Sequence, residues 1–135
     1  MLKTKQVVYG VRERQILQGI DFQVAEGEFI GIIGPNGSGK STFLKNVYKV
    51  LKPQQGEIVL MGEDLLSMTN REMAQRMAVV VQERESSFDF TVEEVVMMGR
   101  QARKRLLERE DDGDRRLVNE ILEQTQLTSL KALSS

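Results

Sequence analysis

The clearest chemistry in this sequence lies in residues 34–41, which read Gly-Pro-Asn-Gly-Ser-Gly-Lys-Ser. The segment matches G-x-x-x-x-G-K-[ST], with Gly34, Gly39, Lys40 and Ser41 at the fixed positions. Glycines allow positive φ angles and let backbone N–H groups approach a phosphate closely. Lys40 would neutralise the β- and γ-phosphate oxygens, and the Ser41 hydroxyl would ligate Mg²⁺. The segment therefore predicts a binding site for a nucleoside triphosphate, with Mg·ATP as the expected ligand.

The remaining residues of this loop belong to the same predicted site: Asn36, Gly37, Ser38 and Thr42. A strand is expected before the loop and an amphipathic helix after it, which would place the loop at a helix N-terminus that attracts anions. An ordinary glycine-rich turn between a strand and a helix is the alternative interpretation. The flanking strand and helix favour the phosphate site.

The composition excludes several other kinds of site. The 135 residues include no Cys and no His, which rules out disulfides, zinc–thiolate centres and histidine bases within this sequence. A bound metal must use oxygen ligands, which suits Mg²⁺. The net charge of −1 disfavours a nucleic-acid partner. No apolar run approaches the ~18 residues of a membrane span and no secretory signal is recognisable, so a soluble cytoplasmic protein is expected.

The elements that must position the loop are expected to form an α/β part over residues 1–89. Continuous apolar runs predict strands buried on both faces at 29–33 and 77–81. Gly10 and Gly19 are expected to act as strand breakers beside two earlier strands. The complete set of expected strands is 6–9, 20–24, 29–33, 57–61 and 77–81.

Helical patterns follow the loop and then dominate residues 90–135. Capping boxes pair Thr69 with Glu72 and Thr91 with Glu94, and they predict helices that run towards Arg76 and Gly99. The helix after the loop is expected to end before Pro53, and its apolar face comprises Phe43, Leu44, Val47, Val50 and Leu51. A last amphipathic helix carries Leu117, Val118, Ile121 and Leu122 on its inner face.

Residues 34–42 are similar to the Walker A motif of the ATP-binding subunits of ABC transporters. Glu26-Gly27-Glu28 before the motif, and Pro53 with Gly56-Glu57-Ile58 after it, stand where that family has them. The resemblance implies an ABC-type P-loop ATPase core with N-terminal antiparallel strands and a helical subdomain.

The same resemblance assigns roles to residues outside the loop. Tyr9 looks like the aromatic residue that stacks on adenine. Gln82 looks like the Q-loop glutamine, which reaches Mg²⁺ and the attacking water, so Lys40 and Gln82 are the implied catalytic residues. Ser134 follows Leu133 as in the start of the signature motif, and would face the γ-phosphate of ATP bound to a partner subunit.

Residues 90–100, Phe-Thr-Val-Glu-Glu-Val-Val-Met-Met-Gly-Arg, resemble the ATPases that energise import of ferric siderophores, haem and vitamin B12. The expected partners are transmembrane permease subunits and a second ATP-binding subunit, and the permease would hold the protein at the inner face of the membrane. An amphipathic helix with ordinary methionine packing is the simpler interpretation of this segment.

The resemblance covers only about the first half of a family member and stops inside the signature motif. The chain by itself is therefore expected to bind ATP but to hydrolyse it negligibly, since the family's second acidic strand and catalytic glutamate lie further on. Residues 29–33 would lack the neighbouring strand of the family sheet, so uncovered apolar surface and self-association are expected.

Several alternatives remain open at this point. The protein could be a soluble ABC-type ATPase without a membrane partner, or a catalytically silent nucleotide-binding fragment. A GTPase or small-molecule kinase is disfavoured, the GTPase because no Asn-Lys-x-Asp sequence occurs. The charge run over residues 100–116 is interpreted as a solvated face, with a docking surface for a membrane subunit or anionic lipid as the alternative.

Overall fold

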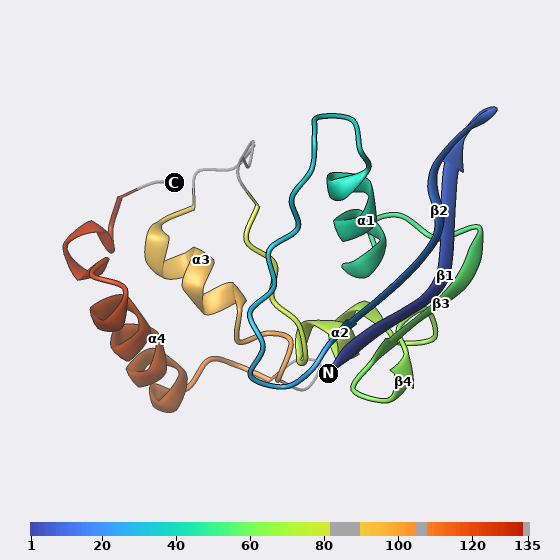
Figure 1. Cartoon of the computed structure of the whole chain (residues 1–135). Coiled ribbons are helices and arrows are strands. Elements are labelled where there is room, and N and C mark those ends of the chain that lie inside the picture. Colours follow the sequence, from blue (N-terminus) through green and yellow to red (C-terminus); the bar gives the residue numbers. More distant parts are fainter. Residues whose placement is uncertain (82–89, 105–107, 134–135) are drawn as a thin grey trace. The chain divides into compact units, whose positions relative to one another are not determined.

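The computed structural model describes residues 1–81, 90–104 and 108–133 of the chain (Figure 1). The chain divides into two compact units, Met1–Met73 (unit 1) and Ala74–Ser135 (unit 2). Each unit is described by itself below. Among the described residues, no helix has both the length and the apolar character needed to cross a bilayer.

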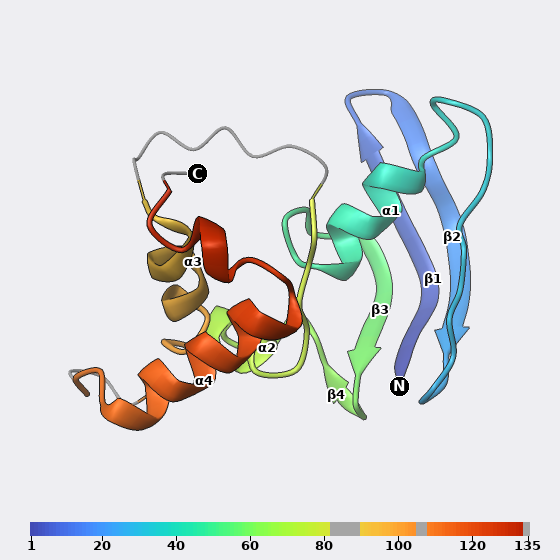
Figure 2. The ribbon, with the colours of Figure 1, turned by 90° about the vertical axis from the view of Figure 1, so that its left-hand side faces the viewer.

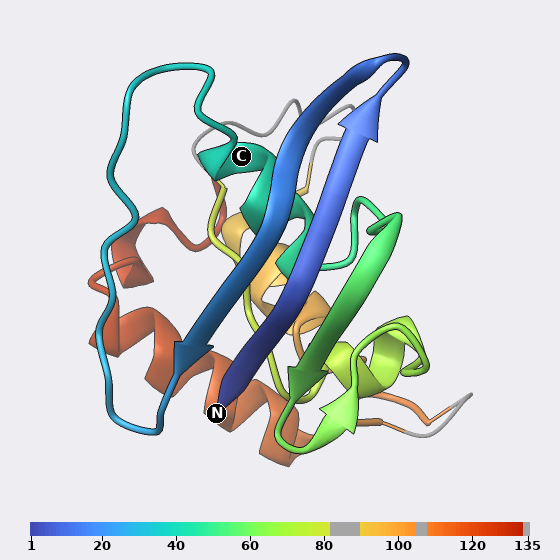
Figure 3. The ribbon, with the colours of Figure 1, turned by 45° about the vertical axis from the view of Figure 1, so that its right-hand side comes forward.

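Unit 1 is built on a four-stranded antiparallel sheet with the strand order β2-β1-β3-β4. The strands are β1 (Leu2–Val11), β2 (Arg14–Val24), β3 (Gln55–Leu60) and the short β4 (Glu63–Asp64). They lie side by side in Figure 3, with the long β1–β2 hairpin at one edge. The first three contain the predicted strands 6–9, 20–24 and most of 57–61, which are confirmed and prove longer than predicted.

Gly10 and Gly19 do not break the strands as predicted, because they lie inside β1 and β2. A Cβ on Gly10 would stand 2.8 Å from the carbonyl oxygen of Arg14, so glycine allows the two arms of the hairpin to come close. Gly19 has a φ of 77°, next to an irregularity in the β1–β2 pairing. A glycine inside a strand here marks a bulge and a close backbone approach rather than an end.

One helix, α1 (Lys40–Val47), packs on the sheet of unit 1. Phe43 from α1 meets Phe22 from β2 edge to face, with ring centroids 5.3 Å apart. Val7 of β1 and Ile58 of β3 are completely buried. This apolar contact holds the start of α1, and hence the glycine loop before it, against β2.

The helix after the loop ends earlier than predicted. Lys49 has a φ of 62°, which stops the helix well before Pro53, and its Nζ donates a hydrogen bond to the Met68 carbonyl oxygen. Leu44 and Val50, expected on the buried face, are 43% and 65% exposed. The buried residues of α1 are Phe43, Asn46 and Val47.

Residues 29–33 and 77–81 are not buried strands, and this prediction is wrong for the chain as it stands. Both segments lie outside the strands of the structure, and Phe29 and Val80 are each 99% exposed. A strand buried on both faces needs neighbours in the sheet, and no strand among the described residues pairs with either segment. The uncovered apolar surface expected at 29–33 is present.

Unit 2 contains the helices α3 (Val92–Met98) and α4 (Asp112–Gln124), followed by the single 3₁₀ turn η1 (Thr128–Leu130). Figure 2 shows α3 beside α4. A small apolar cluster joins them, formed by Met97, Val118 and Leu122 with partly buried neighbours. The two helices predicted for this region are confirmed.

Both predicted capping boxes are present. At α3, Thr91 Oγ1 accepts a hydrogen bond from the Glu94 N–H while the Glu94 carboxylate accepts one from the Thr91 N–H. At the short α2 (Asn70–Ala74), Thr69 and Glu72 exchange the same pair of hydrogen bonds. The sequence pattern was sufficient to locate both helix starts.

The charge run at 100–116 is not simply a solvated face. Asp114 is 2% exposed and accepts a hydrogen bond from Arg100 Nε at 2.9 Å, while Lys104 Nζ pairs with its other oxygen. The hydrogen bonds from Lys104 and from the Asp111 backbone hold the pKa of Asp114 well below its usual range, and the Asp114 carboxylate raises the pKa of Lys104. The segment that was predicted to be a solvated face therefore contains an ion cluster centred on the buried Asp114 carboxylate.

Candidate nucleotide-binding site

The glycine loop is anchored directly on β2. Gly39, the residue before α1, has a φ of 96°. A Cβ at this position would stand 3.2 Å from Leu17 Cδ2 and 3.3 Å from Ile16 Cγ2. Only glycine combines this left-handed conformation with so close an approach, so the fixed glycine of the motif has a structural cause. The contact fixes the loop relative to the strand.

The start of α1 offers unsatisfied donors. The first helical hydrogen bond runs from the Phe43 N–H to the Gly39 carbonyl oxygen at 2.8 Å. Among the described residues, the N–H groups of Lys40, Ser41 and Thr42 have no hydrogen-bond partner. Three donors at a helix N-terminus form an anion site, because the helix dipole adds a partial positive charge there.

The Lys40 ammonium group lies over the same loop. Its Nζ donates to the carbonyl oxygens of Gly34 and Pro35, at 2.6 and 2.8 Å. The turn below is closed by a hydrogen bond of 3.2 Å from the Ser38 N–H to the Pro35 carbonyl oxygen. A phosphate oxygen near the loop would therefore meet a cation that the backbone already positions.

These groups line an open pocket of about 340 Å³. Its walls include Asn36, Gly37 and Gly39 from the loop and Lys40, Ser41 and Thr42 from α1. The Ser41 hydroxyl could ligate Mg²⁺, whose other ligands would be phosphate oxygens and water. The structure thus brings together six of the predicted nucleotide-binding residues.

Five other predicted site residues lie elsewhere or are not described. Tyr9 is half-buried in β1 opposite Leu17 and does not line the pocket. Gly34 and Ser38 line a second, mainly apolar hollow of about 540 Å³, which shares Gly39 and Lys40 with the first pocket. Gln82 and Ser134 lie outside the described residues, so their predicted roles remain predictions.

Two residues of the pocket were missed by the sequence interpretation. Arg14 and Ile16 come from β2, about twenty residues before the motif, and line the pocket beside Gly37 and Thr42. No local pattern marks them. Their spacing of two on a strand does place both side chains on one face, but which face meets the loop is decided by folding.

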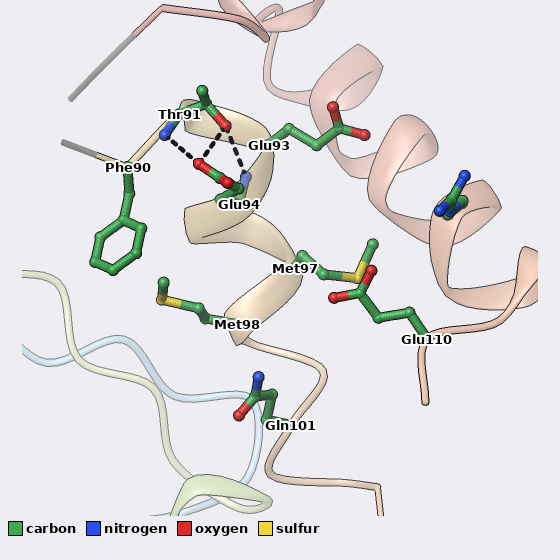
Figure 4. A pocket seen from close by; sticks show the side chains of 9 residues that line it. Phe90, Thr91, Glu93, Glu94, Met97, Met98, Gln101 and Glu110 are labelled. Carbon is green, nitrogen blue, oxygen red and sulfur yellow. Dashed lines mark hydrogen bonds between the residues drawn. The ribbon is translucent and has the colours of Figure 1, made fainter. Parts of the chain in front are cut away.

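Unit 2 has a pocket of its own, of about 480 Å³, between α3 and the start of α4 (Figure 4). Phe90, Met97 and Met98 form its apolar part. Two of its three acidic side chains are engaged in structure: Glu94 closes the capping box, and Glu93 pairs with Lys131 at 2.9 Å. The Thr91 hydrogen bonds to its carboxylate lower the pKa of Glu94. This pocket shows no catalytic arrangement.

Comparison with known proteins agrees with the geometry of the loop. The family model of the ABC transporter matches residues 17–134. The petrobactin import ATP-binding protein FpuC of Bacillus anthracis is 34% identical over 127 residues, which are 94% of this chain and 47% of that protein. The iron(3+)-hydroxamate import ATP-binding protein FhuC of Bacillus subtilis is 33% identical over 92% of this chain and 46% of its own length.

A shorter match has higher identity. The hemin import ATP-binding protein HmuV of Bradyrhizobium diazoefficiens is 48% identical over 85 residues, 63% of this chain and 32% of that protein. The chain thus spans less than half the length of these three relatives.

Solved structures share the fold. A dimeric bacterial ABC transporter cassette superimposes with a TM-score of 0.81 and 26% identity, over 99% of this chain and 61% of that one. A cassette bound to ADP and Pi in a post-hydrolysis state gives a TM-score of 0.79 at the same identity and coverage. The architecture is therefore that of the first part of such a cassette.

Proposed function

The chain belongs to the ABC transporter family, and we propose that it binds Mg·ATP as the nucleotide-binding part of an importer ATPase. The observation that carries this proposal is the open start of α1, where three N–H groups and the Lys40 ammonium converge beside Gly39. A triphosphate supplies the negative charge that such a site selects.

The pocket residues fit a magnesium–triphosphate complex. Ser41 offers a hydroxyl oxygen next to the phosphate donors, which is the kind of ligand that Mg²⁺ accepts. When bound, the metal neutralises phosphate charge. In this proposal Tyr9 stacks on the base, Gln82 contributes to the metal and the attacking water, and Ser134 faces the γ-phosphate held by a second subunit.

The cargo is proposed to be an iron chelate, haem or a corrinoid. The similar proteins support the first two, since they are ATP-binding proteins of hemin, petrobactin and hydroxamate import. The proposed partners are transmembrane permease subunits and a second ATP-binding subunit, with the protein held at the cytoplasmic face of the membrane through the permease. ATP hydrolysis by the complete assembly energises uptake.

Within the 135 residues, binding without turnover is proposed. The lining of the described pocket contains no Asp or Glu, so no carboxylate there can orient or deprotonate water. Even with Gln82 beside the attacking water, charge stabilisation leaves that water without a general base. The chain by itself is therefore proposed to retain ATP rather than split it.

A chimera tests the importer assignment. Residues 1–135 replace the corresponding first part of the Bacillus subtilis hydroxamate import ATPase, to which they are 33% identical. In a strain lacking that ATPase, the chimera is expected to restore hydroxamate-dependent iron uptake. The same chimera with Lys40→Ala is expected to be equally abundant and inactive.

The outcomes separate the levels of the proposal. A stable chimera that binds ATP but supports no uptake would overturn the importer assignment while leaving nucleotide binding intact. Uptake that survives Lys40→Ala would overturn the role of the loop.

A further inference from the structure

We propose that Arg14 is a second phosphate-binding cation of the nucleotide site, beside Lys40. The proposal rests on the proposed function, since it concerns the same pocket and its ligand. Arg14 is the first residue of β2 and lines the pocket of about 340 Å³ together with loop and helix residues. No pattern in the sequence marks it as a site residue.

The position of Arg14 follows from the contact between β2 and the loop. Ile16 Cγ2 would be 3.3 Å from a Cβ on Gly39, so this part of the strand touches the start of α1. Side chains two residues apart on a strand point to the same face. Arg14 therefore lies on the face that carries Ile16, and both residues line the pocket together with Gly37 and Thr42.

The charge of the pocket indicates its ligand. Its described lining contains two cationic side chains, Arg14 and Lys40, and no carboxylate. Among the described residues, the Arg14 guanidinium group forms no ion pair or hydrogen bond. Two cationic side chains that line one pocket without a carboxylate favour a ligand with several negative charges.

The two cations differ in the geometry they offer. Lys40 is a point charge held by the Gly34 and Pro35 carbonyl oxygens. The guanidinium group of Arg14 is a planar fork that can bind two phosphate oxygens at once. In this arrangement, Lys40 and the helix start hold the phosphates at the loop, and Arg14 closes over the chain of phosphates from the β2 side.

The test measures ATP affinity by displacement of a fluorescent ATP analogue from the full chain at submicromolar concentration. Arg14→Gln is expected to weaken ATP binding about tenfold, as expected for the loss of one charge-assisted contact at an exposed site. Arg14→Lys is expected to recover part of the loss. The dependence of affinity on salt should be shallower in Arg14→Gln than in the unaltered chain.

Arg12→Gln is the matched control, because Arg12 lies in the turn of the same hairpin, carries the same charge and does not line the pocket. It is expected to change ATP affinity less than twofold. Equal affinities of Arg14→Gln and Arg12→Gln, with ATP bound by both, would overturn the role of Arg14.

The proposed function fails in a different way. Absence of ATP binding by the unaltered chain, or an affinity that Lys40→Ala leaves unchanged, would overturn nucleotide binding at this loop and the present inference with it. Melting curves of the four variants check that each is folded. If Arg14→Gln is unfolded, the comparison of Arg14→Lys with the unaltered chain decides, and unchanged affinity and salt dependence overturn the proposal.

Discussion

Different interactions stabilise the interior of each of the two units of this chain. Unit 1 relies on a sheet whose strands bury Val7 and Ile58 and on the packing of Phe43 against Phe22. Unit 2 has an apolar cluster centred on Met97, Val118 and Leu122, and it adds a buried ion cluster around Asp114. The first unit is organised by side-chain packing, the second in part by charge.

The difference has a functional meaning. In unit 1, packing of β2 on Gly39 fixes a loop whose own donors and cations remain available for a ligand. In unit 2, Arg100 and Lys104 are satisfied by Asp114, so these charges serve the structure. The pocket of unit 1 contains cations without a carboxylate, whereas Arg100 and Lys104 of unit 2 are paired with Asp114, and this contrast favours unit 1 as the anion-binding unit.

The largest expected effect comes from removing the central cation of unit 1. Lys40→Ala is expected to weaken ATP binding on the order of 100-fold, because it removes charge-assisted contacts to the phosphates. The Lys40 side chain is partly exposed and contacts only loop carbonyls, so the melting temperature should hardly change. Calorimetric titration with ATP and a thermal melt measure the two effects. A large drop in stability with unchanged affinity would contradict the comparison.

The next effect concerns the ion cluster of unit 2. Asp114→Asn removes the charge that Arg100 and Lys104 share and leaves their cations without a counter-ion, so unit 2 should unfold more easily. ATP affinity of unit 1 should remain the same. Hydrogen exchange of the α3 and α4 amides measures the loss, and Asp112→Asn, at an exposed position on the same helix, is the control.

The same cluster predicts a dependence of stability on pH. The pKa of Asp114 is lowered in the folded chain, so its contribution is present above the ordinary aspartate pKa of about 4 and is lost as the pH falls through the lowered value. The pKa of Lys104 is raised, so its contribution is present below about pH 10.4 and is lost as the pH rises through the raised value. Asp114→Asn should flatten both limbs, and identical pH profiles would count against the cluster.

The capping boxes of α3 and α2 give the smallest expected effects and compare a helix of unit 2 with one that begins in unit 1. Thr91→Ala should destabilise α3 by about 1 kcal/mol, because it leaves the Glu94 N–H without its acceptor. Thr69→Ala removes the equivalent acceptor from α2, which has five residues and buries none of them. Denaturant unfolding should therefore detect Thr91→Ala more clearly. A larger effect of Thr69→Ala would show that α2 matters more than its exposure indicates.

Local patterns predicted much of this fold. The glycine motif, the two capping boxes and the short apolar clusters located the loop, the helix starts and the antiparallel strands, since each depends on residues close in sequence. The predictions failed where the conformation or burial of a residue depends on partners far away in the sequence. Residues 29–33 have the composition of a central strand, yet without a described neighbour they remain exposed. Asp114 was missed because its buried state depends on cations ten and fourteen residues away.

For the candidate site too, the sequence predicted the residues of the local motif and missed a residue brought in by folding. The motif predicted Lys40, Ser41 and the glycines, because phosphate binding requires those residue types at that spacing. It could not predict Arg14, since only the contact between β2 and Gly39 brings that side chain to the pocket. A loop motif thus predicts only those site residues that lie within the motif.

The central claim is that the glycine loop of unit 1 binds ATP and that Lys40 is required for this binding. Hydrogen–deuterium exchange of the chain with and without Mg·ATP tests it most directly. We expect ATP to slow exchange at residues 34–42 and at the start of β2, to leave the amides of α3 and α4 unchanged, and to have no effect in Lys40→Ala. Protection that persists in Lys40→Ala, or that appears only in unit 2, would contradict the account.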